Sequence, residues 1–284
     1  ILPGNGSSEL ISLLIETRAP KRTLILGPTY SEYSRELSFS GSTQDYYHLQ
    51  EAEDFELDVE DLCRTLLNGY DFLILCNPNN PTSSAILKDE MRALLSFCAN
   101  RDIFVMIDET YVEFAPSVQE VTAVPYTKDF SNLMVLRGVS KFYAAPGMRF
   151  GYGITGNKEF LSQMKEKQIP WSLNSLGAYA GEQMFKDTSY IRQTRALILT
   201  ERDRMFLELK KLSSFKVYFP YGNFILVKIL KPEVTSFDVF EACIKEGLMI
   251  RDCSSFQCLD GEFIRFCIMK PEDNNRLLKV LKTI

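Results

Sequence analysis

Histidine is almost absent from this chain of 284 residues, since His48 is the only one. Protein zinc sites and Ser-His-Asp catalytic triads both depend on imidazole groups. A single histidine therefore argues against either kind of site, and we expect no metal centre.

Excess positive charge and long apolar runs are also lacking. Lysine and arginine total 32 against 37 aspartates and glutamates, which gives a net charge of -5 and a pI near 5.2. Nucleic acids and anionic membranes are usually bound through basic surfaces, so we expect neither as a partner. No apolar run reaches the length of a membrane span, and no segment resembles a signal peptide.

The chain contains no Cys-x-x-Cys pair, although it has seven cysteines. An odd number, with several members inside apolar runs, fits buried free thiols in a reducing cytosol better than a disulfide framework. The cysteines are Cys63, Cys76, Cys98, Cys243, Cys253, Cys258 and Cys267.

The order of apolar segments predicts an α/β protein with two parts. Strand-like and helix-like segments alternate over residues 23–155, which is typical of a mainly parallel sheet flanked by helices. Short strands separated by a helix follow from residue 215, after a long charged helix over 189–212. We predict a large α/β domain over residues 1–190, and a bridging helix with a small α+β domain over 191–284.

A lysine and an arginine share the turn that follows a predicted strand over 132–137. Lys141 and Arg149 lie eight residues apart among Gly, Pro and aromatic residues. A lysine at the end of a buried strand suits Schiff-base chemistry with a carbonyl, and the arginine suits an anion beside it. The alternative is an ordinary solvated lysine.

Three other turns after predicted strands carry side chains that suit a cofactor. Residues 4–9, Gly-Asn-Gly-Ser-Ser-Glu, precede a helix and offer free backbone N–H groups to an anion, or only a plain helix cap. Tyr30 follows the strand over 23–26 and can cover a planar ring, or simply belong to the core. Residues 77–82, Asn-Pro-Asn-Asn-Pro-Thr, form a stiff polar turn where ligands of α/β sheets bind.

Two charged residues lie in predicted strands or at their ends. Asp108 ends the strand over 103–107 and needs a positive partner, either an arginine or a protonated heteroaromatic nitrogen. Arg265 lies inside the last strand, where it could bind a carboxylate or form a structural ion pair.

Together these residues meet the demands of pyridoxal phosphate (PLP). The cofactor needs a lysine for its aldehyde, donors for its phosphate and phenolic oxygen, a carboxylate for its ring nitrogen and an aromatic ring against its face. The candidates are Gly6, Ser7, Ser8 and Arg149 for the phosphate, Tyr30 for the ring face, Asn80 and Tyr111 for the phenolic oxygen, Asp108 for the ring nitrogen and Lys141 for the aldehyde.

The same segments resemble the class I/II aminotransferase family of fold type I PLP enzymes. The matching motifs are GNGSSE, PTYSEY, NPNNPT, DETY and SKFYAAPGMRFGY, in the family's order and over most of the chain. The resemblance implies a PLP enzyme in which Ser140 helps to hold the phosphate and Arg265 binds the substrate's α-carboxylate. It also implies a cytosolic homodimer whose site lies between the subunits.

Within the family the chain looks closest to the branch of L-threonine-O-3-phosphate decarboxylase, an enzyme of cobalamin synthesis, and histidinol-phosphate aminotransferase, an enzyme of histidine synthesis. Residues 169–182 and 250–266 look more like the decarboxylase, which we favour, with the aminotransferase as the alternative. In either case Arg265 and Arg251 would fix the substrate through its anions. A remote alternative is a non-catalytic regulator that keeps this fold.

The sequence departs from the family's pattern at three positions. Gly138 stands where a Ser or Thr usually supports the phosphate, Ser83 replaces a glycine after NPNNPT, and Thr110 replaces an alanine. We expect these changes to affect loop geometry and phosphate affinity. We also expect that an N-terminal segment with an arm over the site precedes Ile1 in the full protein.

Overall fold

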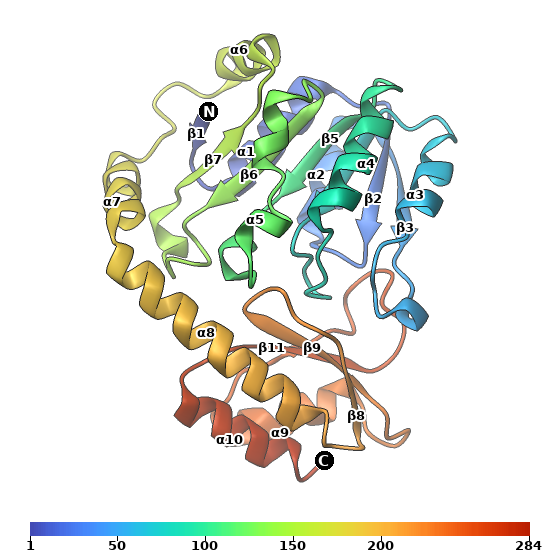
Figure 1. Cartoon of the computed structure of the whole chain (residues 1–284), viewed down its shortest axis with the longest axis vertical. Coiled ribbons are helices and arrows are strands. Elements are labelled where there is room, and N and C mark those ends of the chain that lie inside the picture. Colours follow the sequence, from blue (N-terminus) through green and yellow to red (C-terminus); the bar gives the residue numbers. More distant parts are fainter.

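The computed structural model describes residues 1–284 and contains two sheets joined by a long helix (Figure 1). The first sheet has seven strands in the order β1-β7-β6-β5-β4-β2-β3. Strands β2 to β6 are parallel, whereas β7 runs antiparallel to both β6 and β1. The strands are β1 (Leu2–Gly4), β2 (Arg22–Gly27), β3 (Thr43–His48), β4 (Phe72–Cys76), β5 (Phe104–Asp108), β6 (Leu133–Gly138) and β7 (Gly151–Ile154).

The predicted mainly parallel sheet is confirmed, with one correction at its end. Strand β7 reverses direction because a turn with only one short 3-10 helix, Pro146–Met148, joins it to β6. A parallel neighbour would need a longer crossover, usually a helix. The reversal brings the start of β7 to the edge where β6 ends, and so brings Gly151 beside Gly138.

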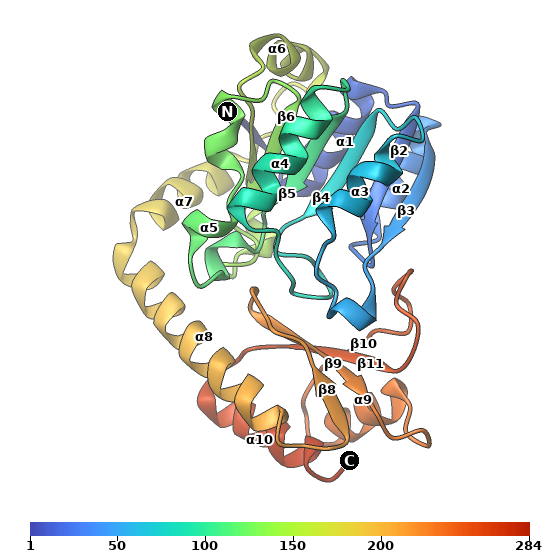
Figure 2. The same ribbon diagram turned by 45° about the vertical axis from the view of Figure 1, so that its right-hand side comes forward.

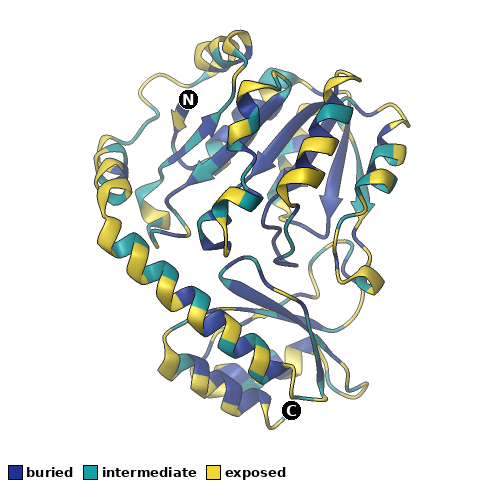
Figure 3. Cartoon of the chain, in the orientation of Figure 1, coloured by how far each residue is buried: buried dark blue, intermediate teal, exposed yellow.

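Helices cover both faces of this sheet (Figure 2). Helices α1 (Ser7–Arg18), α2 (Glu32–Ser40) and α6 (Lys158–Lys167) pack on one face, and α3 (Val59–Leu66) and α4 (Lys88–Ala99) on the other. Strands β4 and β5 are therefore buried along their whole length, as their continuous apolar runs predict (Figure 3). The short helices are η1 (Glu51–Glu53), η2 (Val112–Phe114), α5 (Val118–Val121), η3 (Val124–Lys128) and η4 (Pro146–Met148).

The second sheet is small and antiparallel, in the order β10-β11-β9-β8. Helix α8 (Thr188–Leu209) runs from α7 (Ser175–Lys186), beside the first sheet, to this second unit (Figure 1). The predicted small α+β unit is therefore confirmed. Its remaining elements are β8 (Phe215–Val217), β9 (Phe224–Ile229), α9 (Ser236–Lys245), β10 (Arg251–Asp252), β11 (Phe263–Cys267) and α10 (Pro271–Leu281).

The buried apolar residues form three large clusters, two of which include residues of both units. One core lies on each face of the first sheet, and a third lies between β9, β11 and helices α8, α9 and α10. All seven cysteines are free thiols, but only Cys76, Cys98, Cys243 and Cys253 are buried, so the predicted burial holds for four of them. None of the helices combines the length and the apolar character that a membrane crossing requires.

Candidate active site

A cavity of about 500 Å³ lies between the two units, at the edge where β2, β4, β5 and β6 end. Polar residues follow each of these strand ends and line the cavity, among them Thr29, Asn80, Thr110 and Ser140. The cavity brings together all but one of the predicted site residues: Ser7, Ser8, Tyr30, Asn80, Asp108, Tyr111, Ser140, Lys141, Arg149, Arg251 and Arg265.

Asp108 forms the floor of the cavity, and its own partners are neutral. The carboxylate is 4% exposed and accepts hydrogen bonds from Tyr33 Oη at 2.8 Å and from Thr110 N at 2.9 Å. Burial raises the pKa of Asp108, while these two donors and the nearby Lys141 ammonium partly oppose that rise. A buried carboxylate without a paired cation fits a protonated ring nitrogen, so this position suits PLP.

Lys141 and Tyr111 face the same cavity. The Nζ atom of Lys141 lies 5.5 Å from the centre of the Tyr111 ring. Burial raises the pKa of Tyr111, and the opposing field of Arg265 is weaker. Tyr111 therefore keeps its proton at neutral pH and can donate a hydrogen bond into the cavity.

The start of α1 and Arg149 form one corner of the cavity. Gly6 caps α1 with a φ of 88°, and no side chain caps the helix, so its first N–H groups remain free. A Cβ on Gly6 would overlap the guanidinium of Arg149, and a Cβ on Gly151 would lie 2.7 Å from Ser7 N. A positive helix end with an arginine, kept open by two glycines, suits a phosphate.

Gly6 is the predicted site residue that does not line the cavity itself, although it borders Arg149. Gly138 pairs with Gly151, and a Cβ on it would meet Phe150 O at 3.3 Å, so backbone crowds this position. Its neighbour Ser140 supplies the hydroxyl that lines this side of the cavity.

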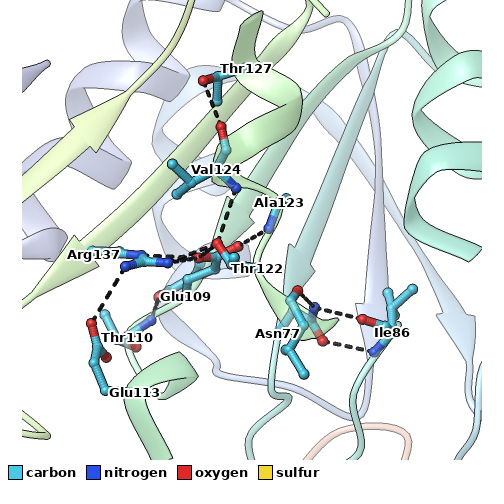
Figure 4. A network of polar contacts seen from close by, with 12 residues as sticks. Asn77, Ile86, Glu109, Thr110, Glu113, Thr122, Ala123, Val124, Thr127 and Arg137 are labelled. Atoms are coloured by element: carbon cyan, nitrogen blue, oxygen red, sulfur yellow. Dashed lines mark hydrogen bonds and ion pairs between the residues drawn. The ribbon is translucent and has the colours of Figure 1, made fainter. Parts of the chain in front are cut away.

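Only one of the three asparagines in the loop after β4 faces the cavity. Asn77 bonds to the backbone of Ile86 and Val121, and Asn79 bonds to Thr29, Pro28 and Thr82. These two side chains hold the loop in shape, as Figure 4 shows for Asn77. Asn80 faces the cavity, where its Oδ1 accepts a hydrogen bond from Arg265 Nη1.

Two arginines from the small sheet close the opposite wall. Arg251 and Arg265 lie directly across from each other on β10 and β11, so their side chains share one face. Arg251 Nη2 donates to Ser255 Oγ at 2.7 Å, and Arg265 stacks over Phe224 with Cζ 5.0 Å from the ring centre. The buried Nε of Arg265 has no hydrogen-bond partner. Its Nη1 donates to Asn80, which is neutral. This arrangement favours an anion receptor over the structural ion pair.

Tyr30 lies at the rim, 37% exposed, with its ring edge-on to Tyr33 at 5.6 Å. Tyr33 itself was not among the predicted site residues, although it is fully buried and bonds to Asp108. The second tyrosine of the segment 28–33 could have indicated such a contact, because a core tyrosine needs a hydrogen-bond partner for its hydroxyl.

The sequence patterns also did not predict a buried ionic network of Glu109, Glu113 and Arg137 beside the cavity (Figure 4). Glu109 is fully buried and pairs with Arg137, whose Nη2 lies 2.8 Å from Oε2. The same carboxylate accepts bonds from Thr122 Oγ1 and Ala123 N. Burial raises the pKa of Glu113 to about 7. The Arg137 guanidinium, 3.9 Å from the Glu113 carboxylate, opposes that rise only in part. Arg137 thus pairs with Glu109 and Glu113 and not with Asp108, whose bonded partners are Tyr33 and Thr110.

The sequence matches the family "Aminotransferase class I and II" over residues 1–281. It is 31% identical over 284 residues to the threonine-phosphate decarboxylase of Salmonella typhimurium, covering 100% of this chain and 76% of that protein. It is 29% identical over 286 residues to the histidinol-phosphate aminotransferase of Methanococcus aeolicus, covering 100% and 75%. The structure superposes on the histidinol-phosphate aminotransferase from Clostridium acetobutylicum with a TM-score of 0.92, at 34% identity, covering 99% of this chain and 82% of that one.

Proposed function

The chain belongs to the aminotransferase class I and II family, and from that premise we propose that it is a PLP-dependent L-threonine-O-3-phosphate decarboxylase. One observation supports this substrate class above others: Arg251 and Arg265 face one cavity from opposite positions of a strand pair. Two neighbouring guanidinium groups match a substrate with two anions, such as an amino acid phosphate.

The residues of the cavity fit each part of PLP. Asp108 would hold the ring nitrogen, Arg149, Ser140 and the N–H groups of Ser7 and Ser8 the phosphate, and Tyr111 and Asn80 the phenolic oxygen. Tyr30 would cover the ring face. Bound in this way, PLP supplies a ring that accepts the electron pair released at the substrate's Cα.

The side chains around the cavity would then orient the substrate and transfer protons. Lys141 would hold the cofactor's aldehyde group through Nζ, and the same amine, when free, would accept or donate a proton in the cavity. Asp108, which Tyr33 and Thr110 hold in place, would accept a hydrogen bond from the protonated ring nitrogen. Arg265 would bind the substrate carboxylate and Arg251 the phosphate, so the two would fix the orientation of the substrate in the cavity.

The activity is tested by assaying the PLP-loaded protein with O-phospho-L-threonine and measuring CO₂ release. Decarboxylation that Lys141→Ala abolishes supports the proposal. The contradicting result is amino transfer from glutamate to the keto partner of histidinol phosphate without release of CO₂.

That second result defines the other candidate, a histidinol-phosphate aminotransferase. It is favoured by the similarity to the enzymes of that name from M. aeolicus and C. acetobutylicum. Histidinol phosphate has a phosphate and no carboxylate, whereas glutamate has two carboxylates. Both substrates could therefore use the same pair of arginines in turn.

The proposal includes a homodimer as the working state. Helix α7 and the segment before it lie at the outer edge of the molecule (Figure 1). Several of their large apolar side chains are exposed. Trp171 is 98% exposed, and exposed apolar patches of this kind mark interfaces. Light scattering should give twice the chain mass for the wild type and one chain mass for Trp171→Glu. The patch consists of Ile169, Trp171, Leu176, Tyr179 and Phe185.

The proposal also places the enzyme in the cytosol, which is supported by its free cysteines.

We further propose that residues 1–190 form a domain that binds the cofactor, and that residues 191–284 form a second unit that contributes the substrate-binding arginines. Limited proteolysis should cut first near the start of α8 if the two units are independent.

A further inference from the structure

Ser83 lies at the joint between the two units, three residues after Asn80. It is completely buried and has a φ of +61°, which L side chains seldom adopt and glycine adopts freely. Its N–H donates to Asn79 O at 2.8 Å, which closes the loop on itself. A serine in this backbone conformation is strained, so its side chain should provide a compensating contact.

The side chain of Ser83 makes that contact with the small sheet. Its Oγ accepts from Gly222 N at 2.8 Å, and its carbonyl accepts from Tyr221 N at 2.8 Å. Residues 221 and 222 belong to the connection between β8 and β9. From the other side, Arg202 Nη1 donates to the carbonyls of Tyr221 and Gly222 at 3.2 and 3.3 Å. The connection is therefore fixed to the loop after β4 and to α8 at once.

This connection leads directly to the substrate arginine. Phe224 begins β9, and its ring lies under Arg265 and edge-on to Tyr111, 5.0 Å away in each case. Arg265 in turn donates to Asn80, which is in the same loop as Ser83. Ser83 and Arg265 are thus linked by two routes, one through Asn80 and one through Gly222 and Phe224.

We propose that Ser83 is a positioning residue that holds Arg265 against Asn80 and so sets the cavity's affinity for a substrate carboxylate. The inference rests on the carboxylate-binding role given to Arg265 in the proposed function. It predicts that loss of the Ser83 hydroxyl weakens carboxylate binding and leaves phosphate binding unchanged, because the phosphate is assigned to Arg251.

Three variants separate the hydroxyl from the backbone strain. Ser83→Ala removes the acceptor and keeps a Cβ at positive φ, whereas Ser83→Gly removes the acceptor and relieves the strain. Ser84→Ala is the matched control, because Ser84 Oγ bonds to Thr82 Oγ1 at 2.7 Å within the loop. Ser83→Gly also keeps the test valid if Ser83→Ala folds poorly.

The test measures binding of 3-phosphoglycerate and of glycerol 3-phosphate to the PLP-loaded protein by calorimetry. Neither probe has an amine, so neither reacts, and only the first has a carboxylate. Both Ser83 variants should weaken 3-phosphoglycerate binding roughly five- to tenfold, the effect of one lost buried hydrogen bond. Glycerol 3-phosphate binding should not change. In an Arg265→Met background, Ser83→Ala should have no further effect.

The positioning role is overturned if Ser83→Ala and Ser83→Gly bind 3-phosphoglycerate as Ser84→Ala does, or if both probes weaken equally. It is also overturned if the Ser83 effect persists in the Arg265→Met background. Failure of the proposed function gives a different result: the wild type itself would then bind 3-phosphoglycerate no better than glycerol 3-phosphate.

Discussion

The hydroxyl of Tyr33 donates a hydrogen bond to Oδ2 of Asp108 across 2.8 Å, and both residues line the cavity. Tyr33 comes from α2 and Asp108 from the end of β5, so this bond joins the helix layer to the strand end. Asp108 has lost nearly all contact with water, and the phenol is one of two neutral donors that stabilise its charge.

Tyr33→Phe removes this donor without changing the packing of the ring. The pKa of Asp108 should rise further, because the carboxylate loses a bond that favours its charged form. A hydrogen bond to a charged group contributes roughly 1.5–3 kcal/mol, so PLP affinity should fall about tenfold or more. Fluorescence titration of the apoprotein with PLP measures this change.

Tyr70→Phe is the matched control for that variant. Tyr70, which precedes β4, donates from Oη to Asp45 Oδ2 of β3 at 3.0 Å, and neither residue lines the cavity. Its PLP affinity should equal that of the wild type. Equal affinities for Tyr33→Phe and Tyr70→Phe would show that Tyr33 does not support Asp108.

Gly6→Ala should reduce PLP binding through the phosphate corner. The new Cβ would displace the Arg149 guanidinium from the start of α1, where both are assigned to the phosphate. Gly41→Ala provides the control, because Gly41 also has a positive φ, +75°, and no atom lies within 4 Å of its Cβ position. Both variants should lose about 1 kcal/mol of unfolding free energy from backbone strain.

Only Gly6→Ala should lose PLP affinity, by at least tenfold in equilibrium dialysis, because displacing a charge-assisted contact has an effect of that order. A similar loss in Gly41→Ala would instead attribute the effect to strain. Unchanged PLP affinity in Gly6→Ala would contradict the assigned phosphate corner.

The motifs at strand ends could be placed from the sequence because each follows a continuous buried strand. Parallel strands share one carboxyl edge, so Asp108, Lys141 and Asn80 had to meet there. The edge strand β3 was missed because its segment is polar and only partly buried. The Glu109–Arg137 pair and the Tyr33–Asp108 bond join distant segments, so the sequence alone does not give the partner of either side chain.

Glu113 should make stability depend on pH. Its folded-state pKa is raised to about 7, so between its unfolded pKa of about 4.3 and pH 7 the folded protein binds more protons. The free energy of unfolding should therefore fall as pH rises through this window, by roughly 3 kcal/mol from this group alone.

Glu113→Gln should abolish that part of the pH dependence, because the amide stays neutral throughout. Urea denaturation at intervals between pH 5 and 8 measures it, as the difference between variant and wild type. The control is Glu120→Gln, which removes the same charge from a half-exposed side chain and should retain the wild-type slope. Parallel curves for Glu113→Gln and the wild type would show that Glu113 is ionised throughout.

The most direct measurement is to treat the PLP-loaded protein with borohydride, which fixes the pyridoxyl group to the amine that carries it, and to locate the label by peptide mass spectrometry. The account predicts one labelled residue, Lys141, on the wall of the cavity whose floor is Asp108. Label on another lysine, or no label at saturating PLP, would contradict it.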